Sequence, residues 1–249
     1  MEKSSLPEEI FLLDEIRAKL KREAEEDYRV FSSRLLPGTG GILGVRLPKI
    51  RRLAKSCAKK YDGKSEPSLF DVYEKACQGG YDLLFEERLF WGMAIGYAKL
   101  EREEREKRLY AFLPLIDNWS VCDSCCITYK FMKEEPEVWW DFLKPLFHSD
   151  EEFIVRFAFV CGLDFFIEKD YIEEFLFLLE GVRCEAYYAQ MAQAWALSMC
   201  YVSFPEQTEK ILTDGGLSDM VQNKTIQKIR ESLQVEKESK DRIVRYRRK

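Results

Sequence analysis

Two side chains with complementary chemistry lie one helical turn apart near the middle of the chain. Trp119 precedes Asp123 by four residues, so both project from the same face if this segment is helical. A carboxylate supplies negative charge, and the π face of a tryptophan attracts a flat cation. The pair is therefore typical of a site that holds a positively charged ring.

Asp123 also belongs to a series of polar residues at a regular interval. Arg156 follows it by 33 positions and Gln190 follows Arg156 by 34, each within an otherwise apolar segment. Trp195 comes five residues after Gln190, about 140° around a helix, where it can flank the same groove. Two interpretations stay open: an Asp123–Arg156 ion pair between neighbouring repeats, or a polar row on a binding face.

Other catalytic and metal chemistries find little support in the sequence. With His148 as its single histidine, the sequence gives little support for a serine–histidine–aspartate triad. Cys122 and Cys125 have CxxC spacing, but no second pair of ligands with matching spacing completes a zinc site. We expect the eight cysteines to be reduced residues of the core, and we expect neither a metal nor a cofactor.

The elements that must position these residues are helices. Apolar residues recur at spacings of three and four, as in Leu12, Ile16 and Leu20, and no strand-like alternation is present. The intervals of 33 and 34 residues suit a repeated pair of helices. We therefore predict an all-α fold, a HEAT-like α-α superhelix that forms one domain over residues 1–249 and has one concave face.

Composition excludes several classes of protein. With 46% hydrophobic residues the chain is not intrinsically disordered, and 13 glycines and 8 prolines are too few for a collagen-like or linker protein. The apolar stretches are too short for a membrane span, and the first residues do not have the layout of a signal peptide. We expect a cytoplasmic monomer.

The net charge of −5 argues against a nucleic-acid partner until its distribution is considered. Residues 42–60 carry seven basic side chains and no acidic one, and residues 216–249 carry ten basic against five acidic. Such segments are most often solvated surface. Basic segments near both ends of an acidic protein nevertheless keep a polyanion among the possible partners.

Several segments resemble the DNA alkylation repair family, the AlkD-like DNA glycosylases built of HEAT-like repeats. The most specific are residues 117–124 (DNWSVCDS) and 223–232 (NKTIQKIRES). Weaker similarity is found in residues 43–54 (LGVRLPKIRRLA), in residues 153–158 (FIVRFA) and at Trp195. The resemblance covers about residues 10–235 and leaves residues 236–249 as a basic tail.

The resemblance implies a DNA repair hydrolase whose concave face binds double-stranded DNA. Active members excise cationic alkylated purines, chiefly 3-alkyladenine and 7-alkylguanine. By matching positions, Asp123 is the catalytic carboxylate, Trp119 and Trp195 frame the deoxyribose, and Arg156 contacts DNA. A cationic base is a good leaving group, so one carboxylate suffices where ordinary glycosidases need two. The polar row and the basic segments supply the other expected DNA contacts: Gln190, Lys49, Arg51, Arg52, Lys224, Lys228 and Arg230.

Two other functions stay open. Gln190 stands where active members of the family often carry a basic residue, and the family includes members with little or no excision activity. A non-catalytic relative that recognises branched or bent DNA needs the basic segments but not Asp123. A HEAT-type scaffold that binds other proteins would suit the acidic net charge.

Overall fold

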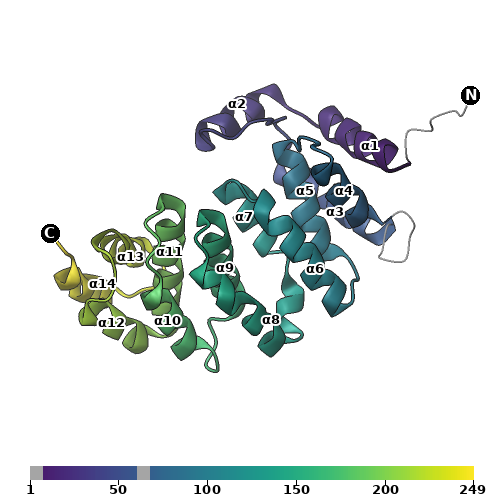
Figure 1. Cartoon of the computed structure of the whole chain (residues 1–249). Helices are drawn as coiled ribbons and strands as arrows, with labels where there is room; N and C mark the ends of the chain where they lie inside the picture. Colours follow the sequence, from purple (N-terminus) through teal and green to yellow (C-terminus); the bar gives the residue numbers. More distant parts are fainter. Residues whose placement is uncertain (1–7, 61–67) are drawn as a thin grey trace, which may run out of the picture. The chain divides into compact units, whose positions relative to one another are not determined.

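The computed structural model describes residues 8–60 and 68–249, and these residues contain 14 α-helices and no β-strand (Figure 1). The predicted all-α fold is confirmed. Helices that are second neighbours in the chain pack side by side, which is the arrangement of an α-α superhelix. The chain divides into two compact units, Met1–Tyr129 and Lys130–Lys249.

The first unit is built around a row of three helices. Helix α5 lies in the middle of this row and packs against α3 and α7, while α6 packs on α5 and α1 packs on α4. The helices of this unit are α1 (Glu8–Arg22), α2 (Glu26–Leu35), α3 (Leu47–Lys60), α4 (Leu69–Gln78), α5 (Phe85–Tyr97), α6 (Arg102–Phe112) and α7 (Trp119–Cys126), with a 3-10 turn, η1, at Leu113–Leu115.

The second unit repeats this plan. Helices α9, α11 and α13 form one row, and α8, α10 and α12 form a second layer against it (Figure 1). The elements of this unit are η2 (Lys130–Lys133), α8 (Pro136–Leu143), η3 (Lys144–His148), α9 (Glu152–Phe165), α10 (Ile172–Gly181), α11 (Tyr187–Ser203), α12 (Pro205–Asp214), α13 (Asp219–Glu231), α14 (Lys237–Ile243) and η4 (Val244–Tyr246).

A buried carboxylate fixes the loop that leads into α3. Glu86 on α5 is 1% exposed and accepts the backbone N–H groups of residues 43–45 at 2.7–3.1 Å. Gly44 in this loop has φ +90°, and a Cβ there would lie 2.5 Å from the carbonyl oxygen of Glu25 and 2.6 Å from the nitrogen of Arg29. Only glycine fits between Glu86 and α2, so this close approach sets where α3 begins.

The predicted basic tail contains a helix, α14, that packs against α13. Asn223 of α13 donates from Nδ2 to the carbonyl of Arg248 at 3.1 Å and accepts the N–H of the same residue at 3.0 Å. One residue earlier, Gln222 donates to the carbonyl of Tyr246 at 3.0 Å. These bonds attach the end of the chain to α13 through its backbone.

Helix α12 contributes a second attachment for the same segment. Glu209 accepts hydrogen bonds from Arg242 at 2.9 Å and from the hydroxyl of Tyr246 at 3.0 Å. The guanidinium of Arg242 holds the pKa of Glu209 below its usual range, so this carboxylate is charged at neutral pH. We call the contacts of Asn223, Gln222 and Glu209 with residues 242–248 the C-terminal clasp.

Candidate functional site

Helix α7 presents Trp119 and Asp123 on its more exposed side. The helix begins where the Asn118 side chain accepts the N–H of Val121 at 3.0 Å, an N-cap that fixes its first turn. Four residues of α7 are buried: Val121, Cys122, Cys125 and Cys126. Trp119 and Asp123 are partly exposed and lie one turn apart, as the sequence predicts. They are therefore accessible side chains on a firmly anchored helix.

A glycine on α5 allows α7 to approach closely. A Cβ at Gly92 would lie 2.5 Å from Sγ of Cys125 and would also collide with the ring of Phe112. The position has no room for even one methyl group, so the packing of α5 against α7 and α6 depends on it. The depth of α7 in the row, and with it the position of Asp123, is thereby fixed.

The cysteines of α7 belong to its packing surface. Burial raises the pKa of the Cys125 thiol well above its usual value, so this thiol is protonated at neutral pH. Over residues 8–60 and 68–249, no three His, Cys, Asp or Glu side chains are grouped so as to hold a metal ion. In the same residues, every helix is too short or too polar to cross a bilayer.

Arg156 connects two helices of the second unit. It lies on α9, is 6% exposed, and donates from Nη1 to the carbonyl of Tyr188 in the first turn of α11 at 2.7 Å. Glu152, one turn earlier on α9, accepts the N–H of Tyr188 at 2.6 Å. This N–H has no partner inside its own helix, so the Glu152 carboxylate satisfies it. Arg156 and Glu152 together hold the beginning of α11 against α9.

Gln190 and Trp195 differ in accessibility although both lie on α11. Gln190 is 8% exposed, whereas Trp195 is half-buried. Trp195 lines a groove of about 270 Å³ between α11 and α13. The other residues that line this groove are Ser198, Met199, Val202, Lys228, Glu231 and Ser232. Trp195 thus offers part of its ring to a ligand in the groove.

Lys228 on α13 brings a cation to the same groove. Burial is the main reason that its pKa lies below its ordinary value, and the charges of Arg156 and Lys224 lower it further, partly offset by Glu231. Within the second unit, the fold therefore brings Trp195 and Lys228 to one groove.

The predicted DNA contacts on α3 have unequal surroundings. Lys49 lies 2.9 Å from a carboxylate oxygen of Glu23 and 3.1 Å from one of Glu25, so two acidic neighbours compensate its charge. Arg51 is half-buried, whereas Arg52 is exposed. Arg52 is the most accessible of the three for a phosphate.

Two further cations next to α3 were missed at the sequence level. Lys19 and Arg22, from the end of α1, line a cavity of about 310 Å³ together with Lys49 and Arg52. The signal was present in the run Lys19-Leu20-Lys21-Arg22, where basic residues surround one buried leucine. Lys19 also pairs with Glu15 at 2.6 Å, which leaves Arg22 as the stronger addition to the basic surface.

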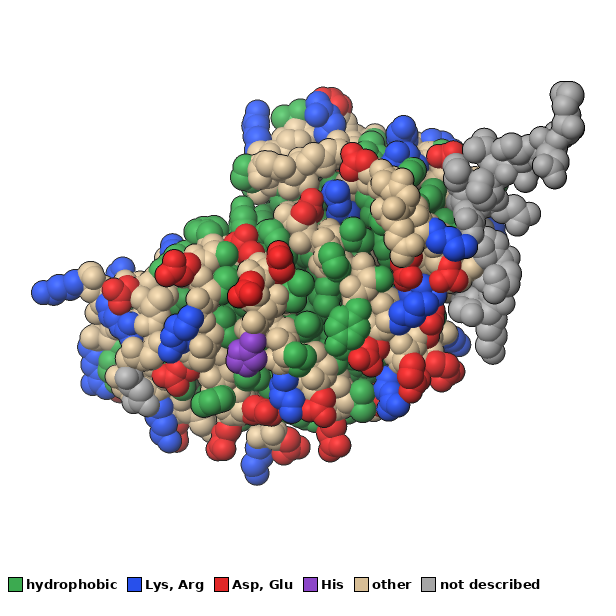
Figure 2. Space-filling model, in the orientation of Figure 1, with side chains coloured by type: hydrophobic (Ala, Val, Ile, Leu, Met, Phe, Trp, Pro, Cys, Tyr) green, Lys and Arg blue, Asp and Glu red, His purple; other side chains and the backbone are tan. Residues whose placement is uncertain are grey.

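Basic residues are concentrated in α3, which has no acidic residue, and in the α13–α14 region, where they outnumber the acidic ones. Helix α6, by contrast, carries both charges in similar numbers. Figure 2 shows Lys and Arg side chains gathered at the end of the second unit that carries α14. On α13, Lys224 is half-buried and donates to Gln227 at 3.2 Å, while Arg230 is exposed.

The comparisons with known proteins agree with the local resemblances. A family model described as DNA alkylation repair enzyme matches residues 16–232. The match includes α7, α9, α11 and α13, which carry the candidate site, and ends just before α14. No curated protein and no solved structure matches the chain.

Proposed function

Because the chain belongs to the DNA alkylation repair enzyme family, we propose that it is a DNA glycosylase for purines made cationic by alkylation. Its role in the repair of alkylated DNA follows from the family. The excision chemistry is supported best by one observation: Trp119 and Asp123 are partly exposed side by side on α7, whose other side is buried. The expected substrates are 3-alkyladenine and 7-alkylguanine in double-stranded DNA.

The chemistry needs one carboxylate. Alkylation at a ring nitrogen gives the purine a positive charge, so the N-glycosidic bond breaks with the electron pair leaving on the base, which departs neutral. Positive charge then develops on the deoxyribose, and the Asp123 carboxylate stabilises it. Asp123 also positions the water that attacks the anomeric carbon and accepts a proton from it. No acid is required to protonate the leaving base.

The tryptophans and the cations have supporting roles in this proposal. Trp119 and Trp195 pack against the deoxyribose and attract the cationic lesion through their π faces. Arg156 and Gln190 contact DNA near the lesion through what remains exposed of their side chains. Phosphates are contacted by the basic residues of α3 and α13: Lys49, Arg51, Arg52, Lys224, Lys228 and Arg230. These contacts carry no base sequence information and make binding depend on salt.

The test is the release of 7-methylguanine from alkylated duplex DNA. Asp123→Asn keeps the shape of the side chain and removes its charge, so we expect base release to fall by about 10²–10³-fold while duplex affinity stays within a few-fold. Asp170→Asn, the same change at an exposed position outside the site, is the control and retains full activity. Full activity of Asp123→Asn, or excision of the neutral base uracil, contradicts the mechanism.

A second candidate, a DNA-binding relative without excision, is favoured by the surroundings of Arg156. Its guanidinium already holds the first turn of α11, and Gln190 is largely buried, so part of the polar row has a structural function. This candidate predicts tight binding of branched or bent DNA and no release of alkylated bases. Binding assays with linear and branched duplexes, run beside the excision assay, separate the two.

A further inference from the structure

The C-terminal segment that the clasp attaches to α13 is rich in positive charge. Residues 237–249 contain seven basic and two acidic side chains. Three of the basic side chains form ion pairs with Glu209 or Asp219: Arg242, Arg245 and Arg248. Three others form no ion pair with any part of the chain that the structure describes: Lys237, Lys240 and Arg247. The positive charges of Lys237, Lys240 and Arg247 are therefore available to an anion.

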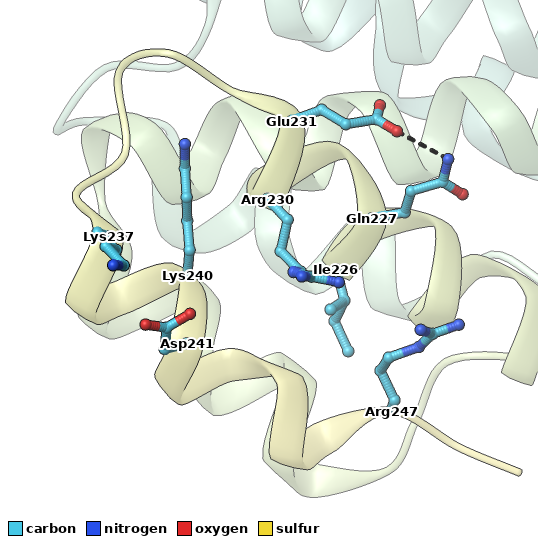
Figure 3. Close-up of a pocket in the computed structure, with 8 residues that line it drawn as sticks. All are labelled: Ile226, Gln227, Arg230, Glu231, Lys237, Lys240, Asp241 and Arg247. Carbon is cyan, nitrogen blue, oxygen red and sulfur yellow. Dashed lines mark hydrogen bonds between the residues drawn. The ribbon is translucent and has the colours of Figure 1, made fainter.

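These three cations line one cavity between α13 and α14, together with Arg230 (Figure 3). The remaining residues that line it are Ile226, Gln227, Glu231 and Asp241. Glu231 accepts a hydrogen bond from Gln227 at 2.8 Å, which engages one of the two carboxylates. Four cations against two carboxylates leave a net charge of +2 on the lining. The cavity therefore favours an anion.

Size and rigidity are also consistent with an anion site. The cavity has a volume of about 370 Å³, room for about twelve water molecules. A phosphate group has only five heavy atoms, so it fits in this space. Helix α14 buries only Ile243, so the polar bonds of the clasp, more than a shared core, hold this segment against α13. A segment whose backbone is already attached before binding loses less conformational entropy when a ligand arrives.

We propose that this cavity binds one phosphate of the DNA backbone, so that the DNA interface extends from α13 onto α14. The proposal rests on the proposed function, because it takes its ligand from the duplex that α13 contacts. Arg230 lines the cavity and lies on the same helix as Lys224 and Lys228, so a strand that follows α13 reaches it. Arginine guanidinium groups pair with phosphate oxygens through two parallel hydrogen bonds.

The experiment measures duplex binding by the full chain at several salt concentrations. We compare Lys240→Gln/Arg247→Gln with Lys169→Gln/Lys210→Gln, which removes the same charge from exposed positions of the same unit. Loss of one phosphate contact lowers the slope of log K against log[salt] by about 0.9 and weakens binding about fivefold at 0.15 M salt. Arg247→Lys keeps the charge and retains most of the slope. Thermal unfolding of each variant checks that α14 stays folded.

The outcomes distinguish failure of the cavity proposal from failure of the proposed function on which it rests. Equal slopes for the two double variants, with duplex binding and base release intact, overturn the cavity proposal and leave the proposed function standing. No duplex binding by the unmodified chain overturns both. Binding of inorganic phosphate in a ³¹P NMR titration, without any effect of Lys240→Gln/Arg247→Gln on the slope, identifies a site for free phosphate and overturns the assignment to DNA.

Discussion

Lys228 has unusual surroundings for a residue proposed to contact DNA. It lies on the wall of the Trp195 groove, burial lowers its pKa, and the charges of Arg156 and Lys224 act in the same direction. A bound phosphate would reverse this effect, because it supplies the negative charge that the cluster lacks. If Lys228 contacts a phosphate as proposed, its protonation is coupled to DNA binding.

The pH dependence of binding tests this coupling. Lys228 binds phosphate only when protonated, and its pKa in the free protein is lowered, so duplex affinity should fall as pH rises from 7 through the alkaline range. Lys228→Arg stays charged and should flatten the profile. Lys224→Arg, the same substitution one turn earlier, should leave the profile unchanged. Fluorescence anisotropy with labelled duplex measures all three, and identical profiles would exclude Lys228 from the interface.

For single residues, the sequence predicts which side chains share a helix face better than it predicts their hydrogen-bond and ion-pair partners. The four-residue spacing placed Trp119 and Asp123 one turn apart on a helix, and α7 includes both. The structural role of Arg156 could not be predicted, because its partner is the backbone carbonyl of Tyr188, 32 residues away. The acidic neighbours of Lys49 were equally hidden, since they follow from the way α1 and α2 meet α3.

At the level of helices and loops, the loop before α3 shows how a helix proposed to bind DNA is positioned. The buried Glu86 carboxylate holds residues 43–45, and Gly44 lies against α2 with no space for a side chain. Breaking this loop would release α3, which carries Arg51 and Arg52. The stability of the loop and DNA affinity should therefore change together.

Alanine substitutions at two glycines of similar backbone conformation would distinguish the cost of steric overlap from the cost of backbone strain. Gly38 and Gly44 have φ values of +84° and +90°, but a Cβ at Gly38 meets nothing within 4 Å. Gly38→Ala should cost about 1 kcal/mol from φ alone. Gly44→Ala adds overlap with the α2 backbone and should cost about 3 kcal/mol or more. Chemical denaturation gives both values, and equal costs would show that the α2 contact does not constrain the loop.

One element, helix α14, was not predicted from the sequence. Residues 236–249 read as a basic tail because they have few apolar residues and no helical periodicity in them. Helix α14 forms there with only Ile243 buried, because the clasp bonds come from Asn223, Gln222 and Glu209 on other helices. A helix that is held by polar residues far away in the sequence has no hydrophobic pattern from which it could be predicted. The rest of the helical fold has such a pattern and was predictable.

For the whole molecule, net charge is a poor guide to partners. The chain has a net charge of −5, but α3 carries basic residues and no acidic one, and basic residues outnumber acidic ones in residues 216–249. At 0.15 M salt, charges farther apart than about 8 Å are largely screened, so a phosphate responds to the nearby basic residues and little to the distant acids. An acidic protein can therefore bind DNA through local surfaces.

The salt dependence of binding tests this view of the molecule. Arg51→Gln/Arg52→Gln should weaken binding of all duplex sequences about equally and lower the salt slope by about one to two units. Lys99→Gln/Lys107→Gln removes the same charge from exposed positions near α6 and should leave the slope unchanged. Affinity that does not vary with salt, or a strong base-sequence preference, would contradict a phosphate-based interface.

The missing side chain at Gly92 has a consequence for substrate range. Since the Cys125 side chain of α7 rests directly on α5 at Gly92, the position proposed for the Asp123 carboxylate beside a sugar is set by helix packing and not by any residue proposed to touch DNA. Displacing a catalytic group by about 1 Å can cost about 10²-fold in rate. In the proposed mechanism, large and small lesions therefore meet the same fixed carboxylate, and any adjustment between them comes from the DNA.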